Sequence, residues 1–308
     1  MENIKSETTG QKHISTIATD IKHLIADISN GKPANMTDEN MEVFLNNIKE
    51  AMLAWNAPRE KEKEGQLRMS SIGKPSRQLW YDKHSPKDRK DEDSGLNLKF
   101  LYGHIIEHLV LYLAELAGHK IEDQQKKIEI DGITGHIDSM IDGEVCDVKS
   151  ASSFSFKKFQ TGEIVSDDPF GYHAQLSGYE EAFGTKNGGF LVVDKSNGDI
   201  CFYKPDDMAK PNVKNLIKNL KTSLKQNEPP EKCYPFKEEK NGNKTLATGC
   251  IFCPHKWECH ADTNGGKGLR VFKYANKNVM LAEVIKEPQV EEITNQYKEQ
   301  LENYGKQT

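Results

Sequence analysis

The stretch from Gly135 to Ser150, which reads GHIDSMIDGEVCDVKS, most constrains how this chain can fold. It contains two short apolar runs on either side of Asp142-Gly143. Asp-Gly between two β-prone runs is a strong signal for a hairpin with a two-residue turn. We therefore expect residues 133–138 and 144–149 to pair as neighbouring strands.

This pairing is expected to bring Asp138 towards Asp147 and Lys149. Because side chains alternate along a strand, Asp147 and Lys149 point to the same face, whereas Val148 points to the core. Two carboxylates beside an ammonium suit a divalent metal ion and a bound water. A surface hairpin held by an ion pair is the alternative that the same residues allow.

The composition indicates a soluble, cytoplasmic protein. The 308 residues suffice for one large domain or two modest ones, and 36% of them are hydrophobic while 29% are charged. No stretch approaches the ~20 apolar residues of a membrane span, and the polar N-terminus does not resemble a secretory signal. We therefore expect no membrane contact. The formal charge of −5 does not itself indicate nucleic-acid binding, although a local basic face is sufficient for it.

The N-terminal residues 1–65 have a polar, helical pattern. Isoleucines at helical spacing occupy Ile14–Ile28, and Thr37 opens a second helix. A charged connector follows at Arg59–Glu64. Because this region shows no group of catalytic residues, we expect an accessory helical arm that offers a docking surface to a protein partner.

Residues 100–119 form the clearest helix of the chain, with one apolar stripe of leucine and isoleucine. Within it, Gly103 allows another backbone to approach, and Glu107 is a carboxylate that is either functional or simply exposed. The other expected elements are a capped helix start within 69–81, a charged loop at 82–95, strands in 126–149, a helix at 172–183, strands at 189–195 and 200–203, a helix at 213–225, and edge strands from Leu269 before a charged terminal helix.

Two basic stretches are candidates for contact with nucleic acid. Lys157 and Lys158 are interleaved with phenylalanines, a pattern that can meet a nucleic-acid strand. Lysines also line one face of the helix at 213–225, where they could follow phosphates; they are Lys214, Lys218, Lys221 and Lys225. The alternatives are a core set of aromatic rings with solvated lysines in the first stretch and a solvated helix face in the second.

Cysteines are concentrated towards the C-terminal end. Cys250, Cys253 and Cys259 lie within ten residues, and Cys233 precedes them by 17 positions. In a cytosolic setting this grouping indicates metal ligands rather than disulfides. Four thiolates supply folding energy to a short segment and fit either zinc or an iron–sulfur cluster. The two remaining cysteines lie in strand-like runs, where we expect buried thiols.

Four motifs appear in the order of a known nuclease family; they are the Gly-X-X-X-Glu of 103–107, the Gly-His-Ile-Asp of 135–138, Asp147-Val148-Lys149 and the Gln-X-X-X-Tyr of 175–179. Together they resemble the RecB-type branch of the PD-(D/E)XK nuclease superfamily over roughly residues 70–260. The detailed pattern is most similar to the exonucleases of tailed phages. The late cysteines resemble the iron–sulfur staple of the CRISPR-adaptation and AddB-like members.

The resemblance implies an α/β fold with a restriction-endonuclease-like core, in which helices flank a central mixed β-sheet. We expect this nuclease core in residues 66–230, after the helical extension of residues 1–65. Residues 231–308 are expected to form the segment stapled by four cysteines, with strands and a helix that pack on the core.

The resemblance also implies roles for individual residues. Asp138, Asp147 and Glu107, with the Val148 carbonyl, would bind Mg²⁺ or Mn²⁺. The remaining catalytic residues would be Lys149, which orients a water and offsets developing charge, and Gln175 and Tyr179, which position the DNA or the water. A [4Fe-4S] cluster on the four late cysteines is preferred to zinc only through the resemblance.

Two departures from the family pattern affect these assignments. Many cluster-bearing relatives carry a cysteine in a Cys-Pro-Arg-X-Leu-Trp-Tyr context, but residues 75–81 read PSRQLWY, so Cys233 has to supply the fourth ligand. Many relatives also use histidine where we place Glu107, and His104 and His108 are close enough in sequence to be the ligand instead.

The predicted function is a metal-dependent DNA exonuclease that acts on linear DNA with free ends. A phage-encoded enzyme of this kind would work in the host cytoplasm in recombination, replication or host-DNA degradation. An endonuclease or a DNA-end-processing subunit of the same fold is the first alternative. A non-catalytic DNA-binding scaffold is the alternative of another class, and it would have no need of Asp138, Asp147 and Lys149 together.

Overall fold

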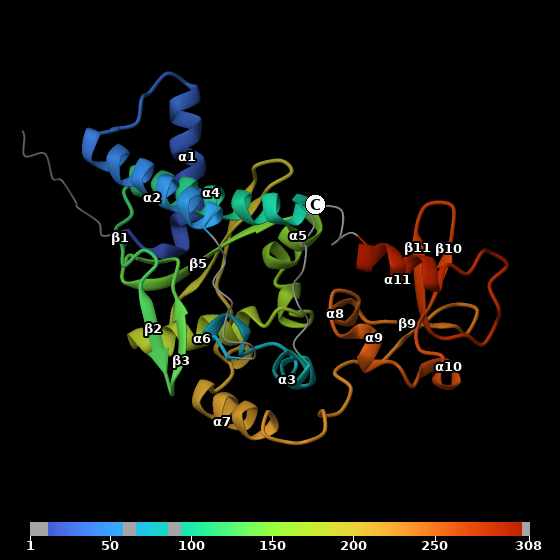
Figure 1. Ribbon diagram of the computed structural model, residues 1–308. Helices are drawn as coiled ribbons and strands as arrows, with labels where there is room; N and C mark the ends of the chain where they lie inside the picture. The colour runs from blue at the N-terminus through green and yellow to red at the C-terminus, as the bar shows by residue number, and fades with distance from the viewer. Residues whose placement is uncertain (1–11, 58–65, 86–93, 304–308) are drawn as a thin grey trace, which may run out of the picture. The chain divides into compact units, whose positions relative to one another are not determined.

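The computed structural model describes residues 12–57, 66–85 and 94–303 (Figure 1). The expected connector at Arg59–Glu64 and residues 86–93 of the expected charged loop lie outside these ranges. The described residues fall into two compact units. The first contains residues 12–57, 99–168 and 172–213, and the second contains residues 66–85, 94–98, 169–171 and 214–303. The domain limits expected at 65/66 and 230/231 stay a prediction.

The first unit is built on a five-stranded mixed sheet in the order β1-β4-β5-β6-β7. Strands β5 and β6 run parallel and the other neighbouring pairs run antiparallel. The central mixed sheet expected from the sequence is therefore confirmed. Its strands are β1 (Ile121–Glu122), β4 (Ser139–Ile141), β5 (Glu144–Ala151), β6 (Gly189–Asp194) and β7 (Ile200–Tyr203).

Helices cover both faces of this sheet. The helices of the first unit are α1 (Ile17–Ser29), α2 (Asp38–Asn56), α4 (Ser94–Leu116, in this unit from Lys99), α5 (Ser153–Thr161) and α6 (Tyr172–Phe183). Helices α1 and α4 share one hydrophobic core with Cys146 and Val148 of β5. On the opposite face, the Phe159 ring of α5 and the Tyr172 ring of α6 pack on Phe190 of β6.

The strand that pairs with β5 is not the one expected. Residues 139–141 (β4) pair with β5, whereas β3 (Ile133–His136) pairs with β2 (Lys127–Ile130). The reason is a second Asp-Gly turn at Asp131-Gly132, with φ of 49° and 74°, alongside Asp142-Gly143 with φ of 52° and 86°. Each two-residue turn pairs its own flanking strands. Two consecutive hairpins result, and Asp138 lies in the link between them.

The first helix belongs to the core of the first unit. Ile17 and Ile21 are fully buried, and they pack with Val110 and Ala114 of α4. Helix α2 differs, because none of its residues is buried and its Phe44 ring stacks on Tyr112 of α4. The predicted apolar stripe is therefore buried in the first half of α1, whereas Ile25 and Ile28 at its end are exposed. In α2 the stripe is half-buried at Phe44 and exposed at Leu45.

The second unit contains an antiparallel four-stranded sheet in the order β10-β11-β9-β8, and its helices are short. The two strands and the terminal helix expected after Leu269 are found, but only β10 is an edge strand, because β11 lies between β10 and β9. Residues 82–84 of the expected loop continue α3. The elements are α3 (Ser76–His84), α7 (Val213–Ser223, in this unit from Lys214), β8 (Lys237–Glu238), β9 (Lys244–Thr245), α8 (Thr248–Ile251), α9 (Lys256–Cys259), α10 (Thr263–Gly266), β10 (Arg270–Lys273), β11 (Asn278–Glu283) and α11 (Thr294–Asn303).

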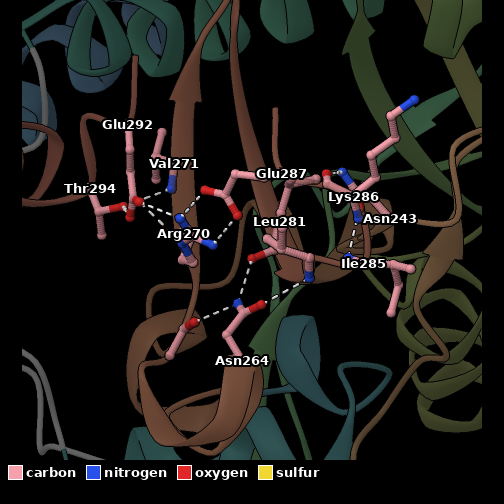
Figure 2. Close-up of polar contacts among 12 residues, drawn as sticks. Asn243, Asn264, Arg270, Val271, Leu281, Ile285, Lys286, Glu287, Glu292 and Thr294 are labelled. Carbon is pink, nitrogen blue, oxygen red and sulfur yellow. Dashed lines mark hydrogen bonds and ion pairs between the residues drawn. The ribbon is translucent and has the colours of Figure 1, made fainter. Parts of the chain in front are cut away.

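Side chains hold the segment that follows β11 (Figure 2). The Asn243 Oδ1 accepts the N–H groups of Ile285 and Lys286 at 2.8 Å each. Asn264 Oδ1 accepts the N–H of Val284 at 2.9 Å. Arg270 binds the carboxylates of Glu287 and Glu292, as Figure 2 shows. Beyond the end of the strand, two asparagine side chains therefore accept the backbone N–H groups that the sheet no longer pairs.

No helix in the described part of the chain is both long enough and apolar enough to cross a membrane.

Candidate active site

Strand β5 presents a buried carboxylate and an ammonium on one face. Asp147 is 1% exposed, and its Oδ2 forms an ion pair with Nζ of Lys149. Val148 between them points into the core that α1 and α4 share. The alternation expected along this strand therefore holds, and it places both charges on the α5–α6 side of the sheet.

Asp138 reaches the same point from the link between the two hairpins. Its Oδ2 accepts the backbone N–H of Val148 at 2.7 Å. Because Val148 lies between Asp147 and Lys149, this bond brings both carboxylates and the ammonium together. The predicted convergence of Asp138, Asp147 and Lys149 therefore occurs, although it depends on β4 rather than on the strand that was expected.

The charges in this group strongly affect each other. Burial raises the pKa of Asp138 well above its ordinary value, and the charges of Asp147 and Glu107 raise it further. Burial likewise raises the pKa of Asp147, against the opposing effect of Lys149. For Lys149, burial acts to lower the pKa, but Asp147 and Asp138 outweigh it and raise the pKa above the ordinary value. The ammonium therefore stays protonated across the physiological range.

Glu107, on α4, lies within electrostatic range of both aspartates, because its charge contributes to the raised pKa of each. Its Oε1 accepts a hydrogen bond of 2.6 Å from Nε2 of Gln125. The His104 side chain is 58% exposed and its Nδ1 lies 3.8 Å from Glu107 Oε2. His108 is buried, and its Nδ1 has no hydrogen-bond partner among the described residues. The choice of metal ligand among these three stays a prediction.

The expected close backbone approach at Gly103 is not found. A Cβ built there would meet only the Ser150 Oγ, at an ordinary 3.6 Å. A side chain rather than a backbone faces this turn of α4, so alanine would fit the same space.

Helix α6 carries the next two predicted residues. Gln175 Nε2 donates a hydrogen bond of 3.0 Å to the Tyr179 hydroxyl, as their i, i+4 spacing allows. Burial raises the pKa of Tyr179, and the charge of Asp147 raises it further. Tyr179 is therefore within electrostatic range of the carboxylates on β5.

The sequence patterns did not identify two residues of this site. The Tyr172 ring lies under the Lys149 Nζ, with 4.8 Å between Nζ and the ring centroid. Its position three residues before Gln175, on the same helix face, is the signal that could have found it. Gln125, which binds Glu107, has a left-handed backbone with φ of 54°. Nothing in the local sequence indicates that conformation.

The carboxylates are a suitable donor set for a divalent cation. The Asp147 Oδ1 is buried and has no hydrogen-bond partner among the described residues. Within the described ranges no three His, Cys, Asp or Glu side chains form a ready-made set around one ion. Mg²⁺ commonly binds one or two carboxylates and keeps several waters. Asp138 and Asp147 supply hard oxygens of that kind, with Glu107 nearby.

The candidate DNA-binding lysines differ in their surroundings. On α5, Phe156 and Phe159 are core residues, whereas Phe154 is 73% exposed. Lys158 pairs with Asp167 and lies over the Phe154 ring, with Nζ 4.7 Å from its centroid. The other candidates are exposed; they are Lys157 on α5 and Lys214, Lys218 and Lys221 on α7. Their contact with DNA stays a prediction.

In the second unit, one cavity is lined by all four late cysteines, Cys233, Cys250, Cys253 and Cys259, and also by Arg77, Tyr81 and His255. None of them forms a disulfide. Arg77 Nε donates a hydrogen bond of 3.1 Å to Cys259 Sγ. Burial raises the pKa of the Cys233 thiol, and the backbone N–H groups of Gln78 and Arg77 oppose that rise. A cluster or metal that joins the four thiols stays a prediction.

Of the two cysteines expected as buried thiols, Cys146 is buried and Cys201 is only half-buried. Cys201 is on β7, an edge strand of the sheet, which explains its partial exposure. Burial raises the pKa of Cys201 to about 11.

Fold and site together define a mixed α/β protein with a buried carboxylate–lysine group on its central sheet. No protein-family model matches the sequence, and no curated protein is significantly similar to it. Among solved structures, an alkaline exonuclease from Laribacter hongkongensis is 15% identical, with a TM-score of 0.36, over 57% of this chain and 94% of that chain. Its complex with dAMP gives 14% identity and a TM-score of 0.37, over 52% and 88%. A phage-related exonuclease from Haemophilus somnus 129PT is 15% identical, with a TM-score of 0.33, over 52% and 90%.

Proposed function

We propose that this protein is a metal-dependent DNA exonuclease. The observation that carries the proposal is the convergence of Asp138, Asp147 and Lys149, in which a buried carboxylate oxygen has no hydrogen-bond partner within the described residues. Burying such charges is costly unless they are paired or bind a cation. A fold that maintains this group near Gln175 and Tyr179 is well suited to phosphodiester hydrolysis, which the motif resemblance also implies.

Mg²⁺ or Mn²⁺ would be held by Asp138, Asp147 and Glu107, with the Val148 carbonyl. Such an ion, when bound, polarises the scissile phosphate and lowers the pKa of a bound water. Lys149 stays protonated beside the aspartates, so its part is to offset negative charge that develops on the phosphate rather than to accept a proton. Gln175 donates to Tyr179, which fixes the amide and leaves its oxygen to accept a hydrogen bond from the attacking water.

For the second unit we propose a [4Fe-4S] cluster on Cys233, Cys250, Cys253 and Cys259, with zinc as the alternative. The thiols share one cavity, and N–H donors face two of them, as thiolate ligands require. Four protein ligands leave no open coordination position, so the role would be structural. Visible absorbance and iron content after anaerobic purification distinguish the two, because zinc gives no visible absorbance.

The proposed substrate is linear DNA with free ends, and a phage-encoded enzyme of recombination, replication or host-DNA degradation is the proposed setting. The test compares linear duplex DNA with a covalently closed circle of the same sequence, in Mg²⁺ and in Mn²⁺. An exonuclease degrades the linear DNA and leaves the circle intact. Cutting of the circle would establish the endonuclease alternative, and cleavage of neither DNA would contradict a nuclease function.

The polarity of digestion requires a second substrate set. Linear DNAs with a 5′ label and either end blocked distinguish attack from the 5′ end and from the 3′ end. An Asp147→Asn protein serves as the control for contaminating nuclease, because that change removes a charge without changing the shape of the side chain.

A further inference from the structure

The Lys149 ammonium is held from two sides. On one side, Nζ forms the ion pair with Asp147 Oδ2. On the other, Nζ lies 4.8 Å from the centroid of the Tyr172 ring. The lysine side chain is 20% exposed, and a cation on an aromatic face is attracted more strongly when it is partly removed from water. These two contacts fix the position of the ammonium beside Asp147 on strand β5.

The Tyr172 ring is itself fixed by its neighbours. It packs against Phe159 and Phe190, with ring centroids 5.9 Å and 6.2 Å away. Both of these rings belong to the buried core on the α5–α6 face. Tyr172 is only half-buried, so its ring lies between this core and the charged group on β5. Movement of the ring away from Lys149 would require repacking of the core.

A single carboxylate holds the first turn of α6, where Tyr172 is located. Asp168 Oδ1 accepts the N–H of Tyr172 at 3.0 Å, and Oδ2 accepts the N–H of His173 at 3.0 Å. The His173 Nδ1 also lies 2.9 Å from Oδ2. The first N–H groups of a helix have no partner within it, so Asp168 satisfies two of them. The same contacts set the rotation of α6 and with it the placement of Tyr172, Gln175 and Tyr179.

We propose that Tyr172 is a positioning residue for Lys149, and that Asp168 positions Tyr172 by holding the first turn of α6. The inference rests on the proposed nuclease function. The aromatic face of Tyr172, rather than its phenolic hydroxyl, holds the Lys149 ammonium in the orientation in which it can contact the phosphate. Removal of the ring would lower the rate of the chemical step and leave DNA affinity unchanged, because Tyr172 acts through Lys149.

The kinetic test compares Tyr172→Leu, Tyr172→Phe and Phe156→Leu on linear DNA. Phe156→Leu is the matched control, because it removes a buried ring of α5 that, among the described residues, is not a ring contact of Tyr172 or Lys149. We expect Tyr172→Leu to lower kcat about tenfold, as loss of one partly desolvated cation–π contact implies, with an unchanged Kd for DNA in Ca²⁺. Tyr172→Phe keeps the ring and should retain wild-type kcat. A wild-type kcat in Tyr172→Leu, an equal loss in Phe156→Leu, or an equal loss in Tyr172→Phe would each overturn the inference.

A second readout does not depend on activity. In protein with ¹³C-labelled lysine, the Lys149 Hε–Cε signal should be shifted upfield by the ring current of Tyr172. The shift should persist in Tyr172→Phe and in Phe156→Leu and disappear in Tyr172→Leu. If Tyr172→Leu does not fold, Tyr172→Met takes its place with the same expectations. An inactive wild-type protein with the ring-current shift intact would contradict the proposed nuclease function but not the contact, whereas an active protein without the shift would contradict only this inference.

Discussion

The Nε of Arg77 donates a hydrogen bond of 3.1 Å to Sγ of Cys259, which lies 182 residues further along the chain. Arg77 is in the first turn of α3, and the backbone N–H groups of that turn also face the thiol of Cys233. A helix N-terminus and a guanidinium both favour a thiolate. One turn of helix thus supports two of the four cysteines around the cavity, in a chain whose PSRQLWY segment carries no cysteine of its own.

Arg77→Gln should weaken the retention of whatever metal or cluster the four cysteines bind. The change removes a charged donor to Cys259, and loss of such a partner typically lowers metal affinity ten- to a hundredfold, so we expect release to a chelator about tenfold faster or more. Lys83→Gln is the control, because Lys83 is on the same helix but donates to the carbonyl of Leu224. Equal release rates for the two variants would contradict the role of Arg77.

Asp147→Ala and Lys149→Ala should each reduce DNA cleavage by about a hundredfold or more, because each removes a charge that acts on the transition state. DNA binding and the folded structure should be largely preserved. The measurements are cleavage of end-labelled linear DNA, binding in Ca²⁺ and circular dichroism. Lys195→Ala changes an exposed lysine after β6 and should leave cleavage unaltered. Undiminished cleavage in either of the first two variants would show that the site is elsewhere.

Asp168→Asn should destabilise the protein in a pH-dependent way. Burial raises the pKa of Asp168, but hydrogen bonds from His173 and Tyr172 outweigh it, so the pKa in the folded state lies below 3.8. A carboxyl whose pKa is lower in the folded protein stabilises the fold at every pH above its pKa in the unfolded chain. That stabilisation is lost as the pH falls through its pKa in the folded protein. The wild type should therefore exceed Asp168→Asn in unfolding free energy by about 1 kcal/mol at neutral pH.

The difference between these two proteins should decrease as the pH falls below about 4. Urea unfolding of both proteins at several pH values measures it. A difference that stays constant down to acid pH would mean that Asp168 is not ionised in the folded state.

Gly73→Ala should cost stability, whereas Gly103→Ala should not. A Cβ on Gly73 would lie 2.4 Å from the Cα and the carbonyl oxygen of Gly171, so two backbones would have to separate. Such overpacking typically costs about 1–3 kcal/mol. A Cβ on Gly103 meets only Ser150 Oγ at 3.6 Å, and alanine favours a helix over glycine by about 1 kcal/mol. Urea unfolding of both variants tests the contrast, and equal destabilisation would contradict it.

The sequence alone determined the local features of the site. The alternation of side chains along β5 placed Asp147 and Lys149 on one face, and the Asp142-Gly143 pair predicted the turn before β5. The helix expected at 172–183 is α6, with the same bounds. These features depend on backbone dihedral preferences and side-chain periodicity, which neighbouring residues set. They therefore remain visible in a single sequence.

The tertiary structure decided which segments meet. It paired β4 rather than residues 133–138 with β5, placed Ile17 and Ile21 of α1 in the core, and brought Tyr172 onto Lys149. It also placed the thiol of Cys233 against the first turn of α3. Such contacts join residues far apart in sequence, and they are selected by the burial and hydrogen bonding of the whole chain. No short stretch of sequence contains the combined effect of these long-range contacts. The sequence therefore indicated the residues of the site but not their complete arrangement.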